Sequence, residues 1–570
     1  MAARIRTLEA ELERRDELLR RMAVIPVPTG TSIGTTAKLH RALDRAIRGA
    51  KRVRRRVDLI RSRWSRSRTG GRDRWEDRLA LAADLIAGEP TEGVGLQRFL
   101  HAASRPTARG AAWLGLVAAT GRYPSPDELQ RAERALRHGT ESLGVMLQTM
   151  HDGADSKAPS AQLRPLTGRV LIDVTNTART DLHTGIQRVV KEAASRWFTD
   201  SRAVAVAWDP ARQVLVELAA DEAERVRSWR DHLPTQSGSK EGLRTTAAAS
   251  DDIVVPWGAT FILPETTDDV VRAACYRAMA MGGCAERLGV IGYDLVPITA
   301  VETVVVEQAG HFSAYLSFLK QCSHLSAISH AAAAEFNAFC AALASQGLPG
   351  PVVQAHPLPP TPHPLDAATI QRVRANLGLQ PDDVVVLIVG SREPRKNHLA
   401  ALWVAEQLWN EGHKFHLVMV GGSAWNDDDA RCEIARLQDL GHTLMTRSRS
   451  TEEELFSLYH TARFTLFPSL YEGFGLPVIE SLAAGTPVVT SNHGSMAEIA
   501  AEGGALLADP RDWDDLLQQT RRMLTDDALL ADLAAQARGR HFTDWEAYAA
   551  DVWRHLVGDE QGSTTHQESQ

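Results

Sequence analysis

The sequence predicts an α/β protein in which two Rossmann-like domains face a cleft, with an α-helical region before them. Short apolar runs alternate with longer helical stretches from residue 169 to about 355, and the alternation recurs from about 384 to 557. Such alternation is typical of a parallel sheet covered by helices. A proline-rich segment, PLPPTPHPLD, separates the two series over residues 357–366. Because open α/β sheets bind ligands beyond the carboxyl ends of their strands, the cleft is the expected binding site.

The strand-like runs define the order of the domains. In the first series they are VLIDVTNT, AVAVAW, DDIVVPW, RLGVIGYDLVPI, HLSAISH and PVVQAH, and in the second VVVLIVG, FHLVMVGG, TLMTR, RFTLFPS and PVVTS. The predicted segments are a short coiled coil (1–25), a linker with a basic amphipathic helix (26–74), a helical accessory domain (75–150), a linker (151–167), the first Rossmann-like domain (168–365), the second (366–557) and a disordered tail (558–570).

Composition and cysteine usage indicate a cytoplasmic protein. A chain of 570 residues with 44% hydrophobic and 24% charged residues suits a soluble protein of two to four domains. Its five cysteines are odd in number, scattered and without a CxxC pair, which argues for a reducing compartment and against a zinc site. The N-terminal stretch lacks the apolar core of a signal peptide, and no apolar run approaches the roughly 18 residues of a membrane span.

The first helix has a heptad pattern. Ile5, Leu8, Leu12, Leu19 and Met22 recur at alternating spacings of three and four, with Arg15 at the one seam position that breaks the pattern, which predicts a short coiled coil over residues 1–25. Two interpretations remain open, a homo-oligomer joined through this segment and an amphipathic helix docked on its own chain.

A strongly basic stretch follows. Residues 41–74 contain 14 Lys or Arg against 3 Asp, and Val53, Val57, Ile60 and Trp64 form one apolar stripe at helical spacing. A basic amphipathic helix is typical of a surface that binds anionic lipid, which would place the protein on the inner face of the plasma membrane. A solvated linker helix is the alternative. Nucleic-acid binding is not favoured, because no aromatic interleaving or recognition motif accompanies the charge.

The helical region at 75–150 carries no chemistry that the sequence reveals. Its clearest feature is PSPDELQRAERAL, where Ser125 can cap a helix and Glu128 can close a capping box.

The stretch from Arg463 to Gly485 combines a strand, a glycine turn and a helix start. Gly473 and Gly475 permit tight turns and close approach of a ligand, and Pro477 suits the first turn of a helix. The resulting helix N-terminus favours phosphate or hydroxyl oxygens. Glu472 and Glu480, eight residues apart, flank it and could face one cleft. The alternative is that Glu472 caps the helix and Glu480 is a solvated surface residue.

A second loop, GSREPRKNH, offers two cations after a strand. Arg395 and Lys396 together could clamp a diphosphate, Arg as a bidentate fork and Lys as a point charge. A basic dipeptide is by itself usually surface. Both this loop and the 463–485 stretch follow strands, however, so they should meet at one edge of the sheet.

These motifs resemble a known family. The chain has EPRKN, then GG after the next strand, then PSLYEGFGLPVIESLAAGTPVV, and earlier TGIQRV, YDLVPI and AISHAAAAEF in the same order. Together, over about residues 168–555, they resemble the retaining glycosyltransferases of family four, which have the GT-B fold.

The resemblance implies roles by position. The catalytic group would be Glu472 at the transferred sugar, with Arg395 and Lys396 on the donor pyrophosphate. The second domain would bind the donor and the first the acceptor. Other donor-binding residues would be Phe474, Gly475, Leu476, Gly421, Gly422 and, on the ribose, Glu480; acceptor-side residues would be Gly185, Ile186 and Asp294. The family needs no metal ion and no cofactor besides the nucleotide sugar.

Two features depart from the family or compete with it. Relatives often have His-Asp where this chain has Tyr293-Asp294, which puts the role of that histidine in doubt here. Asp294 could orient the acceptor or simply cap a turn. The run Asp427 to Asp429 could suggest the metal-binding DxD of another glycosyltransferase fold, but the two-domain layout favours a solvated surface.

The predicted activity is a retaining, metal-independent hexosyl transfer to a cell-surface glycan or a polyprenyl-linked acceptor. EPRKN is frequent among mannosyltransferases of the family, so GDP-mannose is the first choice of donor, with GDP-fucose, UDP-hexoses and dTDP-rhamnose open. The alternatives are another GT-B enzyme, such as an epimerase or phosphorylase, and a non-catalytic partner that recruits a transferase through its first 150 residues.

Overall fold

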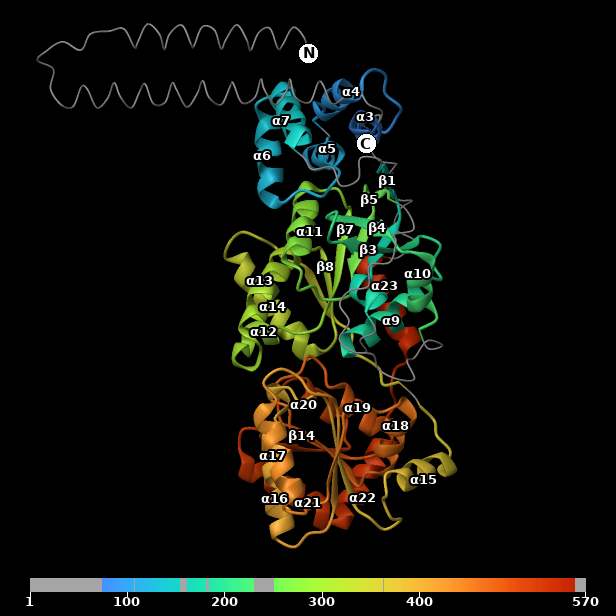
Figure 1. Ribbon diagram of the computed structural model, residues 1–570, viewed down its shortest axis with the longest axis vertical. Coiled ribbons are helices and arrows are strands. Elements are labelled where there is room, and N and C mark those ends of the chain that lie inside the picture. Colours follow the sequence, from blue (N-terminus) through green and yellow to red (C-terminus); the bar gives the residue numbers. More distant parts are fainter. Residues whose placement is uncertain are drawn as a thin grey trace, which may run out of the picture. The chain divides into compact units, whose positions relative to one another are not determined.

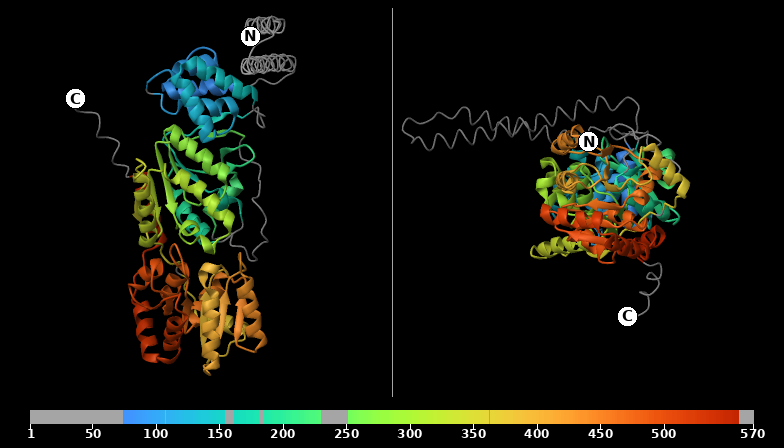
Figure 2. Two further views of the ribbon diagram at one scale, coloured as in Figure 1. Left: turned by 90° about the vertical axis from the view of Figure 1, so that its left-hand side faces the viewer. Right: turned by 90° about the horizontal axis from the view of Figure 1, so that it is seen from below.

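A computed structural model describes residues 74–106, 108–153, 161–180, 184–229, 251–361 and 363–558 of the chain (Figures 1 and 2). The chain divides into two units, Met1–Asp73 and Arg74–Gln570. The predicted coiled coil and basic amphipathic helix fall in the first unit, and they lie outside the described residues, as does the tail after Gly558.

The second unit begins with helices. They are α3 (Trp75–Ala87), α4 (Gly95–Ala103), α5 (Ala111–Thr120), α6 (Pro126–Arg137) and α7 (Thr140–Gly153). Every residue of α5 is buried, because the other helices and α11 surround it. The predicted capping box at the start of α6 is confirmed, with Ser125 accepting from the Glu128 N–H and Glu128 accepting from the Ser125 N–H. Tyr123 joins these helices to the following domain by donating to the Val254 carbonyl at 2.6 Å.

The first α/β domain contains a seven-stranded sheet in the order β4-β3-β2-β6-β7-β8-β9, in which only β4 is antiparallel to its neighbour. Its strands are β2 (Val170–Asp173), β3 (Ala203–Asp209), β4 (Val214–Glu217), β6 (Thr260–Leu263), β7 (Arg287–Gly292), β8 (His324–Ala327) and β9 (Val352–Ala355). Its helices are α8 (Thr175–Arg179), α9 (Gly185–Trp197), α10 (Ala220–Arg227), α11 (Val270–Gly282), α12 (Val296–Thr299), α13 (Val306–Leu319) and α14 (His330–Ala344), with the 3-10 turn η1 (Val301–Thr303). Figure 1 shows helices on both faces of the sheet.

Two expectations for this domain need correction. The run DDIVVPW forms β5 (Ile253–Val255), which pairs with β1 (Leu163–Pro165) in a separate two-stranded sheet rather than in the main one. Consequently the stretch predicted as a linker over 151–167 contains a strand, and α7 runs to Gly153. The main sheet instead takes β6, a run of only four residues that the alternation did not separate from β5.

The second α/β domain contains a six-stranded, fully parallel sheet in the order β12-β11-β10-β13-β14-β15. Its strands are β10 (Val385–Val389), β11 (His416–Val420), β12 (Leu444–Arg447), β13 (Phe464–Phe467), β14 (Val488–Ser491) and β15 (Ala505–Ala508). Its helices are α15 (Ala367–Asn376), α16 (His398–Asn410), α17 (Asp428–Asp439), α18 (Glu452–Thr461), α19 (Leu476–Ala483), α20 (Gly494–Ala500), α21 (Trp513–Thr525) and α22 (Asp527–Arg538), with the 3-10 turn η2 (Pro394–Lys396).

The alternation of β10 explains the two layers of helices. Val386 and Ile388 pack with α16 and α21, whereas Val385 and Leu387 pack with α18 on the opposite face. A strand that is buried on both faces reads as a continuous apolar run, which is why the sequence pattern identified it. Five strands of this sheet were predicted; β15 was not, since its ALLA run is short and half-exposed.

The last helix returns to the first domain. α23 (Trp545–Val557) packs on α9, β7 and β8, and Figure 1 shows it, in red, beside α9. Trp197 donates to the Ala549 carbonyl at 2.9 Å, and Arg287 donates to the Val557 carbonyl at 2.6 Å. The final helix of the second domain, predicted over 366–557, therefore belongs to the first domain instead. No helix among the described residues is both long and apolar enough to cross a membrane.

Candidate active site

The candidate site lies where the strand order of the second sheet reverses. From β10 the chain moves outward through β11 and β12, then returns to β13 on the other side of β10. The loops after β10 and β13 are therefore neighbours at the carboxyl edge, which is the usual ligand position in open α/β sheets. The Leu470 N–H donates to the Arg395 carbonyl at 2.7 Å and ties the two loops together.

Glu472 is held between two cations. Its Oε2 lies 2.6 Å from Nη1 of Arg395, and its Oε1 lies 2.6 Å from Nζ of Lys396. Ser469 also donates to Oε1 at 3.1 Å. Arg395 makes a second ion pair with Glu393 at 2.7 Å. The structure thus brings the three predicted catalytic residues into direct contact, on loops that are about 75 residues apart in the chain.

The charges of this cluster hold Glu472 ionised. Burial favours the neutral acid, but the neighbouring Arg395 and Lys396 charges outweigh it and hold the pKa of Glu472 at about 2. The pKa of Arg395 is raised above its ordinary value, since the attraction of Glu472 and Glu393 exceeds the cost of burial. Burial, with Lys396 and Arg392 nearby, lowers the pKa of His398 to about 3, so this imidazole is neutral at physiological pH.

The glycine turn after Glu472 is shaped by the first domain. A Cβ on Gly473 would lie 2.4 Å from the Tyr293 carbonyl oxygen, so only glycine fits against that loop. Ser329 donates to the Gly473 carbonyl at 2.6 Å, and Ser495 donates to the Glu472 carbonyl at 3.0 Å. Gly475 has a φ of 110° and caps α19, which is a conformation that favours glycine. Pro477 has no N–H, and the Val478 N–H donates to the Gly475 carbonyl at 2.9 Å, so the Leu476 N–H is the group at the start of α19 that has no acceptor within the helix.

Phe474 points away from the cation cluster. Its side chain is buried and lines a cavity on the other side of the loop. Only its backbone, therefore, is available to the donor position that the sequence assigned to it.

Glu480 is not solvated. One carboxylate oxygen lies 2.5 Å from Nη1 of Arg188 on α9, and the other accepts from the Tyr459 hydroxyl at 3.0 Å. Gly185, at the start of α9, faces Leu476, because a Cβ built there would lie 3.4 Å from the leucine side chain. The predicted acceptor-side turn and donor-side helix are thus in contact across the two domains.

Tyr293 and Asp294 have mainly structural contacts. The Tyr293 hydroxyl donates to the Pro264 carbonyl at 2.7 Å and reaches the Ile186 carbonyl at 3.4 Å, inside the first domain. Asp294 accepts from the Val296 N–H at 3.1 Å, and it also faces Gly473. Burial raises the pKa of Asp294, while the Arg395 charge opposes that shift.

Gly421 and Gly422 support the cation loop from behind. A Cβ on Gly421 would lie 1.9 Å from the Gly390 carbonyl oxygen, so the two loops approach as closely as backbone allows. Arg392 donates to the Gly421 carbonyl at 3.0 Å and pairs with Asp427 at 3.2 Å. Asp427 is therefore a half-buried partner of Arg392 rather than the solvated residue that was expected. The described residues hold no cluster of three potential metal-ligating side chains.

Sequence reasoning missed several contacts of the site. Arg188 lies within the TGIQRV motif, which indicated the turn after the first strand but not the ion pair of Arg188 with Glu480. Glu498 caps α14 by accepting from the His330 and Ala331 N–H groups at 3.1 and 2.9 Å. In the sequence, Glu498 is only an acidic residue in a short segment, and the neighbouring residues do not indicate that it caps a helix more than 160 residues away.

The chain is similar to known proteins. Residues 369–540 match the model of the family described as glycosyl transferases group 1. The chain is similar to the serotype-specific mannosyltransferase WbdA of Escherichia coli, with 27% identity over 351 residues, which are 59% of this chain and 40% of WbdA. It is also similar to the O-antigen chain mannosyltransferase B of Escherichia coli, with 34% identity over 169 residues, 28% of this chain and 42% of that protein. The chain thus spans about two fifths of the length of these curated relatives.

Among solved structures, the chain is similar to sucrose-phosphate synthase from Thermosynechococcus elongatus, with a TM-score of 0.47 and 19% identity, covering 68% of this chain and 98% of that one. Two doubly wound domains that face each other give the chain the GT-B fold. The family match and the mannosyltransferase relatives support a glycosyltransferase.

Proposed function

We propose that the chain is a retaining hexosyltransferase that moves a sugar, mannose as the first choice, from a nucleotide donor to a cell-surface glycan or a polyprenyl-linked acceptor. The observation that carries the proposal is the position of Glu472 between Arg395 and Lys396, at the point where the strand order of the second sheet reverses.

The charge balance of the cluster suggests how the donor binds. Arg395 and Lys396 carry two positive charges, which Glu472 and Glu393 neutralise. A donor diphosphate offers the same cations stronger acceptors, with the bidentate geometry that arginine prefers. When the cations turn to the diphosphate, Glu472 becomes free to accept hydrogen bonds from hydroxyls of the transferred sugar. The cations would then stabilise the charge that develops on the leaving nucleoside diphosphate.

The glycine turn completes the donor site. Gly473 and Gly475 allow the backbone before α19 to approach the sugar, and the start of α19 adds the Leu476 N–H and a partial positive charge. Glu480 would hold the ribose with a carboxylate that Arg188 and Tyr459 already orient.

Retention follows from attack on the face that the donor leaves. The bond between the anomeric carbon and the phosphate oxygen breaks, a bond from the acceptor oxygen to that carbon forms, and the acceptor proton passes to the departing phosphate. This scheme needs no separate protein base, which agrees with Asp294 being engaged with the Val296 N–H.

The donor sugar is proposed from the relatives. WbdA and the O-antigen chain enzyme are both named mannosyltransferases, and both match this chain at modest identity. GDP-mannose is therefore the first donor to test, ahead of GDP-fucose, UDP-hexoses and dTDP-rhamnose.

A donor screen tests the proposal. The melting temperature and the slow hydrolysis of a nucleotide-sugar panel are measured with the full chain. GDP-mannose at 100 times its dissociation constant should stabilise the protein by about 2.7 kcal/mol, a shift of a few degrees. If no nucleotide sugar shifts the melting temperature or is hydrolysed, the chain is not a transferase, and a non-catalytic partner becomes the better interpretation.

The roles of the first 74 residues are proposed from the sequence alone. We propose that residues 41–74 attach the enzyme to anionic membrane and that residues 1–25 form a homo-oligomer. Flotation of the full chain with vesicles containing phosphatidylserine, against vesicles of phosphatidylcholine alone, tests the first. Equal recovery with both vesicles would rule out electrostatic attachment. Sedimentation equilibrium of the full chain and of a chain lacking residues 1–25 tests the second.

A further inference from the structure

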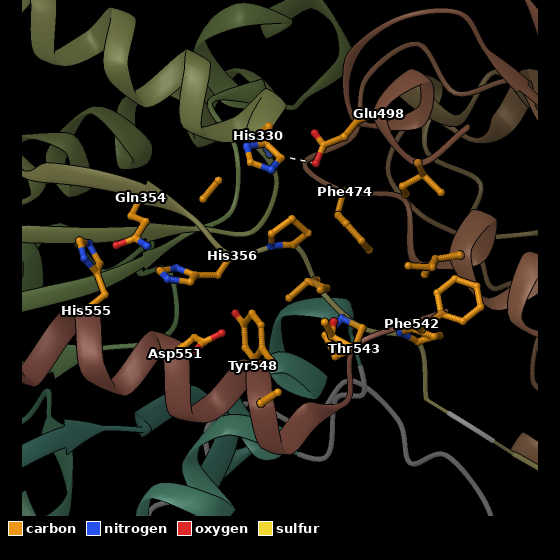
Figure 3. Close-up of a pocket in the computed structure, with 18 of the residues that line it drawn as sticks. His330, Gln354, His356, Phe474, Glu498, Phe542, Thr543, Tyr548, Asp551 and His555 are labelled. Carbon is orange, nitrogen blue, oxygen red and sulfur yellow. Dashed lines mark hydrogen bonds between the residues drawn. The ribbon is translucent and has the colours of Figure 1, made fainter. Parts of the chain in front are cut away.

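A cavity lies behind the glycine turn. It has a volume of about 1070 Å³ and is lined by the end of β9 with the following crossover segment, by α23, by the 540–543 segment and by α19 and α20. None of the three residues of the cation cluster lines it, but Phe474 does. Figure 3 shows Tyr548, Asp551 and His555 on α23, with Gln354 and His356 facing them and Phe474 and Glu498 on the opposite side.

Two buried donors of this cavity lack acceptors. The Tyr548 side chain is 4% exposed, and its hydroxyl has no hydrogen-bond partner among the described residues. Nε of Arg540 is likewise without an acceptor in the part of the chain that the structure describes. Figure 3 shows the Tyr548 hydroxyl directed toward the space between Asp551 and His356. Because buried donors are normally paired, these two point to an occupant that accepts hydrogen bonds.

The charges of the lining are already balanced. Three arginines face three carboxylates, and two of the arginines are paired within the cavity wall, Arg540 with Glu502 at 3.1 Å and Arg554 with Asp551 at 2.7 Å. Glu498 accepts hydrogen bonds from the first N–H groups of α14. Burial lowers the pKa of both His324 and His356 to about 4, so these rings are neutral hydrogen-bonding groups at physiological pH. A charged ligand would find no excess of opposite charge here.

The remaining walls are flat and apolar. The rings of Phe474, Phe542 and Tyr548 line the cavity, together with Pro357, Pro359 and Pro360. Such a combination of apolar faces with a few convergent polar groups suits a neutral ligand that has both hydroxyls and C–H faces. Pockets for drug-sized molecules span roughly 300–1,000 Å³, so this one has room for more than one sugar ring.

We infer that this cavity binds neutral hexose units of the acceptor glycan, away from the end that reacts. The inference rests on the proposed transferase function, which supplies a glycan as substrate. A glycan held here would contact the side of the turn opposite the donor, through Phe474, and would keep the growing chain on the enzyme between transfers.

A single hydroxyl tests the inference. Tyr548→Phe removes the unpaired hydroxyl and keeps the ring. Tyr315→Phe is the matched control, because the Tyr315 side chain is also buried, its hydroxyl also lacks a partner among the described residues, and it does not line the cavity. Neither change removes a formed hydrogen bond, so both variants should fold. Binding of an α-linked mannotetraose to the full chain is measured by calorimetry, and KM for the nucleotide sugar by kinetics.

We expect Tyr548→Phe to weaken mannotetraose binding about fivefold, as the loss of one hydrogen bond does, and Tyr315→Phe to leave it unchanged, with KM for the donor the same in both. Equal binding by wild type and Tyr548→Phe would overturn the inference, as would displacement of the tetrasaccharide by inorganic phosphate from this cavity. If these tests fail while wild type still hydrolyses a nucleotide sugar, only the glycan site is lost. If Tyr548→Phe weakens binding and no donor is hydrolysed, the transferase proposal fails instead.

Discussion

Arg188 of α9 and Glu480 of α19 form an ion pair of 2.5 Å that joins the two α/β domains beside the proposed ribose position. Glu480 is almost fully buried, and its other oxygen accepts from Tyr459. Burial lowers and the Glu480 charge raises the pKa of Arg188, and the net shift is upward. The pair therefore connects the geometry of the donor site to the contact between the domains.

Removing Arg188 should cost considerable stability. Arg188→Met leaves the buried Glu480 carboxylate without its cation, and we expect a loss of about 3–5 kcal/mol in urea unfolding. Glu480→Gln in the same chain should recover much of that loss, which a double-mutant cycle measures. The exposed pair Arg372–Glu453, at 2.8 Å, supplies the control, and Arg372→Met should cost no more than about 1 kcal/mol. Equal costs for the two methionine variants would contradict the prediction.

Lys396 should be needed for chemistry. Lys396→Ala removes one of the two cations proposed to stabilise the leaving diphosphate, and kcat with the donor identified in the screen should fall about 100- to 1,000-fold. The exposed Lys414 is the control, because Lys414→Ala removes a cation of the same domain that lies outside the cluster. If Lys396→Ala kept full transfer to a natural acceptor, the site assignment would be wrong.

The acidic limb of the stability curve should depend on Glu472. Its pKa is about 2 in the folded protein, below the ordinary glutamate value of about 4.3. A lowered pKa contributes stability that is fully present above the ordinary value and is lost as the pH falls toward 2. The unfolding free energy of wild type minus that of Glu472→Gln should therefore shrink by on the order of 3 kcal/mol between about pH 5 and pH 2. A difference that stays constant over this range would falsify the lowered pKa.

Gly473 should not tolerate a side chain. Gly473→Ala would place a Cβ 2.4 Å from the Tyr293 carbonyl oxygen, so the turn or the domain contact must shift. We expect a loss of about 1–3 kcal/mol in stability together with a rise in KM for the donor. Gly310→Ala is the control, since Gly310 lies in α13 with open space around it and the helix favours alanine by up to about 1 kcal/mol. Two alanine variants of equal stability would show that the turn is not confined.

Tyr293 should act on stability and not on chemistry. Its hydroxyl donates to the buried Pro264 carbonyl inside the first domain. Tyr293→Phe should therefore lower the unfolding free energy by about 1–2 kcal/mol while kcat stays within about threefold of wild type. A large fall in kcat with unchanged stability would instead show that Tyr293 takes the place of the histidine common in relatives.

Local patterns predicted most of the second domain. A strand that is buried on both faces is a continuous apolar run, and β10, β11, β13 and β14 have this pattern. The predicted edge strand β12 is partly exposed and does not. Because the strands are parallel, all their carboxyl ends meet at one edge, which is why the sequence predicts that Arg395, Lys396 and Glu472 lie together. The capping box at Ser125 was also predictable, because Ser125 and its partner Glu128 lie only three residues apart in the sequence.

Four short strands were not predicted. β1, β4, β6 and β15 are three or four residues long, as the identified strands β13 and β14 are, so length alone does not explain why they were missed. The sheet accepts them because neighbouring strands supply the hydrogen bonds, a contribution that lies elsewhere in the chain.

By itself, then, the sequence determined the two α/β series, the loop after β10, the glycine turn after β13 and the chemistry of the residues on them. Only the tertiary structure decided that Arg188 pairs with Glu480, that Glu498 caps α14, that α23 returns to the first sheet and that a cavity lies behind Phe474. These contacts join segments from about 170 to 350 residues apart. The physical reason is that hydrophobic periodicity reports which face of an element is buried, whereas partners across two domains depend on how whole sheets pack.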